Sequence, residues 1–151
     1  MKQLLFSLLL LLVGVSSCQK DTYDAAKQAA IDEQAIKDFI SSNNIQGAVR
    51  HSSGLYYVIS APGTGSVTYS GSTSVKAKYA GRLLSGQIFD SSSTGINFTL
   101  GQVIQGWQIG IPLIQKGGKI RLLIPSTLAY GNTATGAIPP NSVLDFDVEL
   151  L

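Results

Sequence analysis

The sequence predicts an α+β fold, in which an antiparallel β-sheet with one hydrophobic face is covered by one short α-helix and preceded by a helical arm. Residues 144–150 alternate between apolar and acidic side chains, the pattern of a strand with one buried face. After residue 54, only residues 103–114 have helical apolar spacing, and Gly106, Gly110 and Pro112 keep that helix short. A second helical pattern covers residues 24–42. Together these observations indicate a helix layer on a sheet layer.

The first 18 residues have the architecture of a secretory signal peptide. Lys2 provides a positive charge, residues 4–13 form an apolar run, and small residues precede Cys18. This run is well short of the ~20 residues that span a bilayer. Residues 15–18, Val-Ser-Ser-Cys, resemble a bacterial lipobox, which implies a lipoprotein signal peptide over residues 1–17 and acylation of Cys18. The alternative is an ordinary signal peptide that is cleaved near a chance cysteine.

A lipidated N-terminus would anchor the protein to the bacterial cell envelope. We expect Cys18 to bind the outer membrane, on its periplasmic or surface face, because acyl chains contribute ~0.8 kcal/mol per buried CH₂. Residues 18–23 would form the lipidated tether, and residues 24–53 a helical arm with Asp32 and Glu33 on its polar face. The arm either mediates dimerisation or docking, or it packs on the domain or spaces it from the membrane.

The remaining residues, 54–151, are expected to form one domain of short strands and turns. Ser85-Gly86 is typical of a hairpin turn. Alternation places Tyr79 toward the core, whereas Asp145, Asp147 and Glu149 are expected to face solvent. A Gly/Ser/Thr connector is expected at residues 64–72, and strands at 55–59, 75–79, 88–89, 98–100, 120–124 and 144–150.

Composition and residue spacing exclude several functions. The net charge is only +2 and forms no basic stripe, so we expect no nucleic acid partner. His51, the single histidine, precedes the first strand, which argues against a Ser-His-Asp triad, and the ligands for a zinc site are too few. With the acidic residues of 144–150 on a solvent face, Asp90 has no second carboxylate for glycoside hydrolysis. We therefore expect neither a metal nor a cofactor.

An inward-facing apolar set is the candidate site. Each member taken alone could be ordinary core packing, but the set is richer in aromatic residues than the core of a small domain usually requires. An apolar pocket with a few polar groups, here Asp90 and the Tyr130 hydroxyl, is the usual form of a ligand site. The set comprises Tyr79, Phe89, Val103, Ile104, Trp107, Tyr130, Ile138 and Phe146.

Six short motifs occur in order along the chain: Tyr79-Ala80-Gly81, Gly86-Gln87-Ile88-Phe89-Asp90-Ser91-Ser92, Val103-Ile104-Gln105-Gly106-Trp107, Ala129-Tyr130-Gly131, Ile138-Pro139-Pro140-Asn141 and Phe146-Asp147-Val148-Glu149-Leu150. With these motifs, the chain from about residue 55 to 151 resembles the FKBP-type peptidyl-prolyl cis-trans isomerases. The resemblance implies a twisted antiparallel sheet wrapped around one short helix. The helical arm and the lipobox also resemble those of lipid-anchored bacterial members.

The resemblance also implies a role for each residue of the site. Trp107 would be the floor beneath the proline ring, and the Ile104 N–H and the Tyr130 hydroxyl would donate to substrate carbonyls. Asp90 would lie near the twisting amide with Tyr79 among its contacts. Implied catalytic residues are Tyr79, Phe89, Asp90, Tyr130 and Phe146, and implied substrate-binding residues are Val103, Ile104, Trp107, Ile138 and Ile96.

The chain departs from the best-known members of this family near Asp90. Residues 91–97 contain no arginine to pair with that carboxylate, and Ile96 replaces an aromatic wall residue. The loop after Gly131 has Thr133-Ala134-Thr135 where those members carry histidine and proline. These differences bear on the orientation of Asp90, on peptide preference and on the binding of macrolide inhibitors.

The function implied is acceleration of X–Pro bond rotation in exported, proline-containing polypeptides. Rotation has a barrier of roughly 18–20 kcal/mol, and both isomers are accessible at X–Pro bonds. A dry aromatic pocket favours the less dipolar twisted amide, without proton transfer or a covalent step. The alternative is a membrane-anchored, chaperone-like module that binds Pro-containing chains with little turnover.

Overall fold

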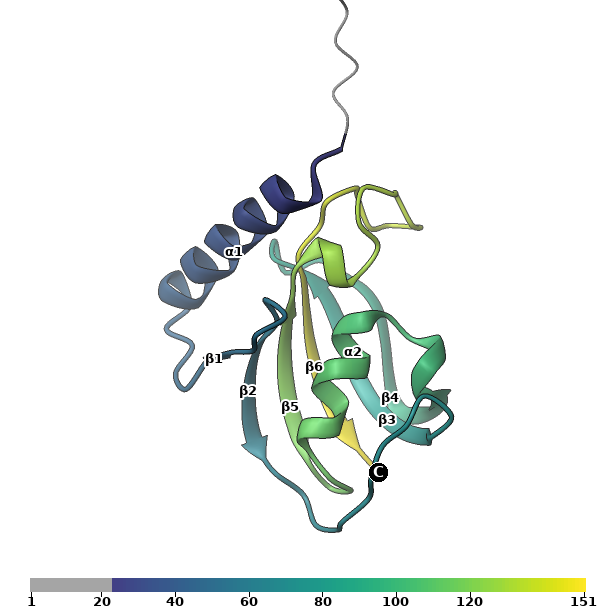
Figure 1. Cartoon of the computed structure of the whole chain (residues 1–151). Coiled ribbons are helices and arrows are strands. Elements are labelled where there is room, and N and C mark those ends of the chain that lie inside the picture. The colour runs from purple at the N-terminus through teal and green to yellow at the C-terminus, as the bar shows by residue number, and fades with distance from the viewer. Residues whose placement is uncertain (1–22) are drawn as a thin grey trace, which may run out of the picture.

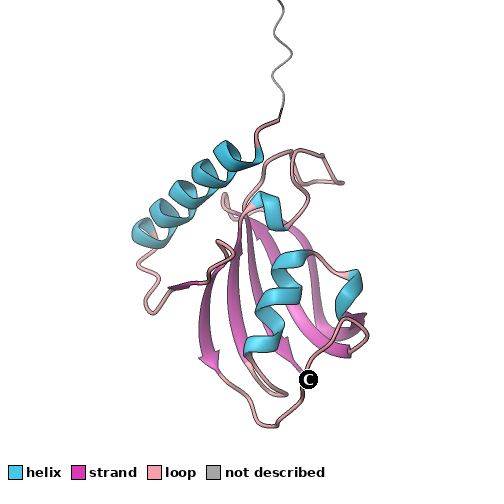
Figure 2. Cartoon of the chain, viewed as in Figure 1, coloured by secondary structure: helices cyan, strands magenta, loops and turns pink. Residues whose placement is uncertain are grey.

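A computed structural model describes residues 23–151 of the chain. A six-stranded, wholly antiparallel sheet runs in the order β1-β2-β5-β6-β3-β4, which confirms the predicted fold class (Figures 1 and 2). The C-terminal strand β6 lies near the middle of this order, between β5 and β3. The strands are β1 (Val49–Arg50), β2 (Tyr56–Ala61), β3 (Ser74–Leu83), β4 (Ile88–Thr99), β5 (Lys119–Ile124) and β6 (Leu144–Leu150).

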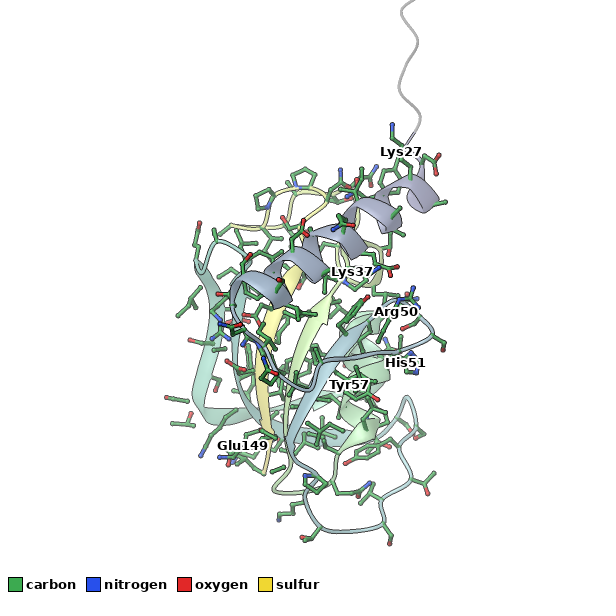
Figure 3. All side chains as sticks on the ribbon, turned by 90° about the vertical axis from the view of Figure 1, so that its left-hand side faces the viewer. Lys27, Lys37, Arg50, His51, Tyr57 and Glu149 are labelled. Atoms are coloured by element: carbon green, nitrogen blue, oxygen red, sulfur yellow. The ribbon has the colours of Figure 1, made fainter. Side chains whose placement is uncertain are left out.

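The two α-helices lie on opposite faces of the sheet. The short helix α2 (Gln105–Gly110) crosses the inner face, while α1 (Ala25–Ser42) lies across the outer face (Figures 1 and 3). Asp24 caps α1, since its carboxyl accepts the N–H groups of Ala26 and Lys27 at 3.0 Å each. Three 3₁₀ turns complete the fold: η1 (Leu100–Gln102), η2 (Ile111–Leu113) and η3 (Ser126–Leu128).

Two glycines of α2 let this helix lie close to β5. A Cβ on Gly106 would collide with the side chain of Ile124, and one on Gly110 would lie 2.5 Å from Leu122. Both glycines are buried at spacing i, i+4, so they form one smooth stripe on the helix. The sequence indicated that these glycines shorten the helix; the structure adds that they hold Trp107 tightly against the sheet.

The inner core is one continuous cluster beneath α2. Its side chains come from alternate positions of the strands, and partly buried aromatic residues pack at its edge. The fully buried members include Leu55, Ala77, Ile111, Leu122, Ile124 and Leu144.

The outer face of the sheet is not a solvent face along its whole length, which corrects one expectation. Asp145 is only 2% exposed and accepts hydrogen bonds from Arg121 at 2.8 and 2.9 Å and from Arg82 at 3.2 Å. Asp147, by contrast, is exposed as expected. Strand alternation put Asp145 on the correct face of the sheet. The pattern did not reveal that two arginines and α1 cover the part of this face where Asp145 lies.

A small second core joins α1 to the outer face. It contains Ile36 of the helix, which is fully buried, together with Tyr56, Leu123 and Val143. Of the alternatives for the arm, the structure shows α1 packed on the domain. The division of the chain at residues 24 and 54 stays a prediction, although β1, within the arm, pairs with β2.

The two faces predicted for α1 are wrong at two adjacent positions. Asp32 is 1% exposed, while Ile31, which the spacing placed with the apolar residues, is 52% exposed. Asp32 is buried because it accepts hydrogen bonds from Ser126, far away in the sequence. Glu33 lies as expected at the rim, where it pairs with Arg50 at 2.9 Å and with Lys37 at 2.9 Å.

Residues 88–100 form one long strand and a turn instead of the two short strands predicted. The strand β4 pairs with β3 from end to end, with register shifts between Ala77 and Tyr79 and between Gly81 and Arg82. These irregularities break the alternation in sequence, which is why the segment resembled two strands.

The predicted signal peptide, Cys18 and most of the tether lie outside the described residues. Within residues 23–151, no helix combines the length and the apolar character needed to cross a membrane. The same residues contain no group of three or more His, Cys, Asp or Glu side chains arranged to hold a metal ion.

Candidate active site

A cavity of about 340 Å³ opens between α2 and the inner face of the sheet at β3, β4 and β6. Seven residues predicted for the site line it, and two further residues, Phe98 and Gln102, join them. The complete lining is Tyr79, Asp90, Phe98, Gln102, Val103, Ile104, Trp107, Tyr130 and Phe146. Helix, strands and loops thus each contribute to one enclosure.

Trp107 lies at the centre of the aromatic lining. It is 3% exposed, and its ring meets those of Phe98, Tyr79 and Phe146 edge to face at centroid distances of 5.1, 5.4 and 5.5 Å. Its indole nitrogen is buried and has no hydrogen-bond partner in the described part of the chain. The rings fix one another, so the cavity has a rigid apolar floor.

A single hydrogen bond connects the two polar groups on the sheet side of the cavity. The Tyr79 hydroxyl donates to Asp90 at 2.6 Å. The pKa of the Tyr79 hydroxyl lies well above its usual range. Burial is the largest cause, and the hydrogen bond to Asp90 is the second. Tyr79 therefore stays protonated, and stays a donor to Asp90, throughout the neutral and moderately alkaline range.

The opposite wall is formed where the chain enters α2. Ile104 is the N-cap of the helix with an extended ψ of 150°, so Val103 and Ile104 lie along the cavity before the chain turns. The Gln108 amide donates to the Val103 carbonyl at 2.7 Å and holds this entry in place. The wall is thus fixed from within the helix that also carries Trp107.

The loop after β5 brings Tyr130 to the cavity. The carbonyl of Ser126 accepts the N–H groups of Ala129 and Gly131, both at 2.9 Å, so the residues on either side of Tyr130 are tied to one point. The Gly131 carbonyl accepts from the Asn141 N–H at 2.7 Å and closes the base of the loop. Tyr130 itself is 37% exposed, as expected for a residue at the mouth of a site.

Three residues predicted for the site lie outside the lining. Phe89 supports the wall from behind, since its ring meets Phe146 edge to face at 5.5 Å. Ile138 is 5% exposed and belongs to the inner core. Ile96 is 44% exposed on the edge strand β4 and does not reach the lining.

The prediction overlooked Phe98 and Gln102 as lining residues. Phe98 carried a usable signal, because it lies two residues after Ile96 on the same strand and five residues before the motif of Val103 and Ile104. Its ring contacts both Tyr79, at 5.7 Å, and Trp107. Gln102 carried no such signal, since only the turn η1 directs it toward the cavity.

No lysine or arginine of residues 23–151 forms an ion pair with Asp90, in agreement with the lack of arginine in 91–97. Asp90 is exposed, and Tyr79 is its hydrogen-bonding side chain. The site thus combines one oriented carboxylate with an aromatic chamber. Such an arrangement can bind an apolar ring and an adjacent amide, but it offers no nucleophile and base pair for covalent chemistry.

A larger hollow of about 690 Å³ lies on the outer face, beside the loop that follows α1. Its lining mixes apolar side chains with charged ones, among them Lys78, Lys119, Arg121, Asp147 and Glu149 (Glu149 is labelled in Figure 3). It has no cluster of aromatic rings that could bind an apolar group. The smaller inner cavity is therefore the candidate active site.

Comparison with known proteins agrees with this geometry. The family model described as FKBP-type peptidyl-prolyl cis-trans isomerase matches residues 65–151, from the connector before β3 to the last residue. The FKBP-type isomerase FkpA of Escherichia coli K12 is 43% identical over 142 residues, which cover 92% of this chain and 51% of that protein. The chain spans about half the length of the curated relatives it matches.

Two solved structures are also similar to this chain. The crystal structure of E. coli FkpA superposes with a TM-score of 0.71 at 42% identity, covering 83% of this chain and 61% of that one. A peptidyl-prolyl cis-trans isomerase from Pseudomonas syringae superposes with a TM-score of 0.69 at 32% identity, covering 86% of this chain and 96% of that one. The family match, these relatives and the aromatic cavity lead to one conclusion: the chain belongs to the FKBP-type peptidyl-prolyl cis-trans isomerases.

Proposed function

We propose that this protein accelerates cis-trans isomerisation of X–Pro bonds in exported polypeptides. The observation that carries the proposal is the cavity floored by Trp107 and bordered by the hydrogen-bonded pair Tyr79 and Asp90. Its volume of about 340 Å³ suits a proline ring with its flanking peptide groups.

Catalysis would come from differential binding of the twisted amide. The planar amide is stabilised by resonance and is more dipolar than the twisted form, so transfer into an apolar chamber favours the twisted form. Trp107 and Phe146 would hold the proline ring while the preceding carbonyl rotates. The Ile104 N–H and the Tyr130 hydroxyl would hold substrate carbonyls, and Asp90, oriented by Tyr79, would face the rotating amide.

The test is an isomerisation assay without a coupling protease, on the chain from Gln19 onward, which contains every described element. We expect a rate above that of buffer, and a lower rate for Asp90→Ala and Phe89→Ala with a native far-UV circular dichroism spectrum. Binding of a Pro-containing chain with a rate equal to buffer would favour the chaperone-like module instead. Full activity in both variants would show that the site is misassigned.

We also propose that the protein is an envelope lipoprotein, anchored through acylated Cys18 to the outer membrane on its periplasmic or surface face. The support is the sequence of residues 1–18, with Lys2, an apolar run and small residues before the cysteine. Cells that express the chain should incorporate labelled palmitate into it, and Cys18→Ala should abolish the label. Unchanged labelling of that variant would contradict the proposal.

Macrolide binding is a further proposal that rests on family membership. Position 96 holds isoleucine instead of an aromatic residue, and residues 91–97 contain no arginine to pair with Asp90, so we expect weaker inhibition than in the best-known members of the family. Titration of Trp107 fluorescence with a macrolide would measure the affinity directly, since Trp107 is the only tryptophan of the chain.

A further inference from the structure

A buried carboxyl group outside the cavity has no part in the proposed reaction. Asp32 lies in the middle of α1 and is 1% exposed. Its Oδ2 accepts the backbone N–H of Ser126 at 2.8 Å and the Ser126 hydroxyl at 2.6 Å, and its Oδ1 accepts from the Gln28 amide at 2.7 Å. A buried carboxyl with this many donors is a fixed point of the structure.

The main hydrogen-bonding partner of Asp32 is Ser126, which also holds the loop that carries Tyr130. Ser126 is itself 1% exposed and begins η3. Its N–H and hydroxyl donate to Asp32, while its carbonyl accepts the N–H groups of Ala129 and Gly131. One peptide segment therefore connects the carboxyl of α1 with the two amides that flank Tyr130.

The helix that carries Asp32 is held in place independently of this contact. Ile36, one turn further along, is fully buried in the second core, and Glu33 pairs with Arg50 and Lys37. Figure 1 shows α1 passing beside the loop that follows β5. Asp32 is thus presented from a rigid element, as a group that orients an active-site loop must be.

We propose that Asp32 is a positioning residue, which sets the place of Tyr130 at the cavity through its two hydrogen bonds to Ser126. The inference rests on the proposed isomerase function. Asp32 and all of α1 lie before residue 65, where the family match begins, so this support is supplied by the arm and not by the matched residues. The arm then contributes to the active site as well as to stability.

The first test compares two variants of Asp32 in the full chain, kept in mild detergent. Asp32→Ala leaves the Ser126 N–H and hydroxyl buried without an acceptor, so the loop should shift. Asp32→Asn keeps one oxygen that can accept from Ser126. Its new amide nitrogen can donate to the side-chain oxygen of Gln28 if the Gln28 amide group rotates. We expect Asp32→Ala to lower kcat/KM about five-fold, the equivalent of one lost neutral hydrogen bond to substrate, and Asp32→Asn to restore most of it.

A double-mutant cycle tests whether the effect passes through Tyr130. Tyr130→Phe alone should lower kcat/KM by a similar factor. In the Tyr130→Phe background, Asp32→Ala should then change kcat/KM less than about two-fold, because the group it positions has already gone. Losses that multiply in the double variant would overturn the proposal.

A matched variant separates positioning from stability. Ile36→Ala removes a fully buried side chain from the same helix but leaves the bonds between Asp32 and Ser126 in place. At a temperature where all variants are folded by circular dichroism, Ile36→Ala should retain the parent kcat/KM. An equal loss in Ile36→Ala and Asp32→Ala would mean that any weakening of α1 has this effect, and the proposal would fail.

Hydrogen exchange tests the inference without turnover. The amides of Ala129 and Gly131 should exchange faster in Asp32→Ala than in Ile36→Ala, because their acceptor belongs to Ser126. Equal exchange in both variants would overturn the positioning role. If the parent chain isomerised no faster than buffer, the proposed function would be refuted, but the hydrogen-exchange comparison would still test the role of Asp32. The two failures are therefore distinguishable.

Discussion

The inner and outer faces of the sheet are built from alternate residues of the same strands, yet the inner face forms the aromatic cavity and the outer face holds α1. On β6, Phe146 faces the aromatic chamber and its neighbour Asp145 faces the outer side, where it is enclosed by Arg82 and Arg121. On β5, Leu122 supports α2 and Leu123 supports α1. One backbone thus carries two separate surfaces, each with its own helix.

The difference lies in how each face is filled. The inner face uses rigid rings that meet edge to face and enclose a cavity of about 340 Å³. The outer face beneath α1 is filled by aliphatic side chains together with Tyr56 and Phe39, which leave no aromatic cavity within the described residues, and ion pairs lie at its margin. A binding face must stay hollow, whereas an anchoring face is most stable when it is closed.

The largest expected effect concerns the outer face. Asp145→Ala leaves Arg82 and Arg121 partly buried without their common partner, so the free energy of unfolding should fall by about 3 kcal/mol. The value of kcat/KM should not change, because the inner chamber is untouched. Urea denaturation and the isomerisation assay measure the two quantities.

The control for Asp145 is its exposed neighbour on the same strand. Asp147 also pairs with Arg82, but its side chain is 58% exposed, so Asp147→Ala should cost less than about 1 kcal/mol. Equal costs for the two variants would show that burial of Asp145 contributes nothing.

The second prediction concerns the contact between α2 and the inner face. The methyl group of Gly106→Ala would collide with Ile124 and lift the helix, which should cost about 2 kcal/mol and lower kcat/KM by displacing Trp107. Gly71→Ala is the control, since its Cβ would lie 3.8 Å from Gly101, at ordinary contact distance. Thermal unfolding and activity are measured together, and a stable, fully active Gly106→Ala protein would contradict the close approach.

The third prediction affects activity more than stability. Tyr79→Phe removes the 2.6 Å hydrogen bond to Asp90 and should lower kcat/KM about five-fold, the equivalent of one hydrogen bond of about 1 kcal/mol. Tyr69→Phe is the matched control, because its hydroxyl donates to the Ile114 carbonyl at 3.0 Å, outside the cavity. That variant should lose stability alone. Loss of activity in both would assign the effect to the fold in general.

The smallest expected effect is a dependence of stability on pH at the margin of the outer face. The pKa of Glu33 is lowered from 4.5 to about 2. The hydrogen bond from Arg50 is the largest cause, and the hydrogen bond from Lys37 is the next. Since the folded pKa is the lower one, the stabilisation is complete above pH 4.5 and is lost as the pH falls toward 2. Urea midpoints at pH 7 and pH 3 should differ more in the parent than in Glu33→Gln, and equal differences would argue against this contribution.

Much of the inner face was predictable from particular residues. The alternation of residues 144–150 predicted the strand and placed Phe146 inward, and the family resemblance of the motif at residues 103–107 implied Trp107 as the floor. Gln102 was missed as a lining residue because a 3₁₀ turn has no fixed period in sequence. Phe98 was missed although its strand position indicated an inward face. The exposure of Ile96 was missed because register shifts interrupt the pairing of β3 with β4.

The periodicity of the sequence was enough to predict the fold class and the order of most elements and, with the help of the family resemblance, seven of the nine residues that line the cavity, because periodicity reports which side chains share a face. Which polar residues are buried depends on how distant segments meet in the folded chain. Asp32 and Asp145 have unremarkable positions in their local patterns, and each is enclosed by partners from other segments; Asp32 and Ser126 are 94 positions apart. The burial of a carboxyl depends on the donors that meet it in space, and periodicity carries no information about them.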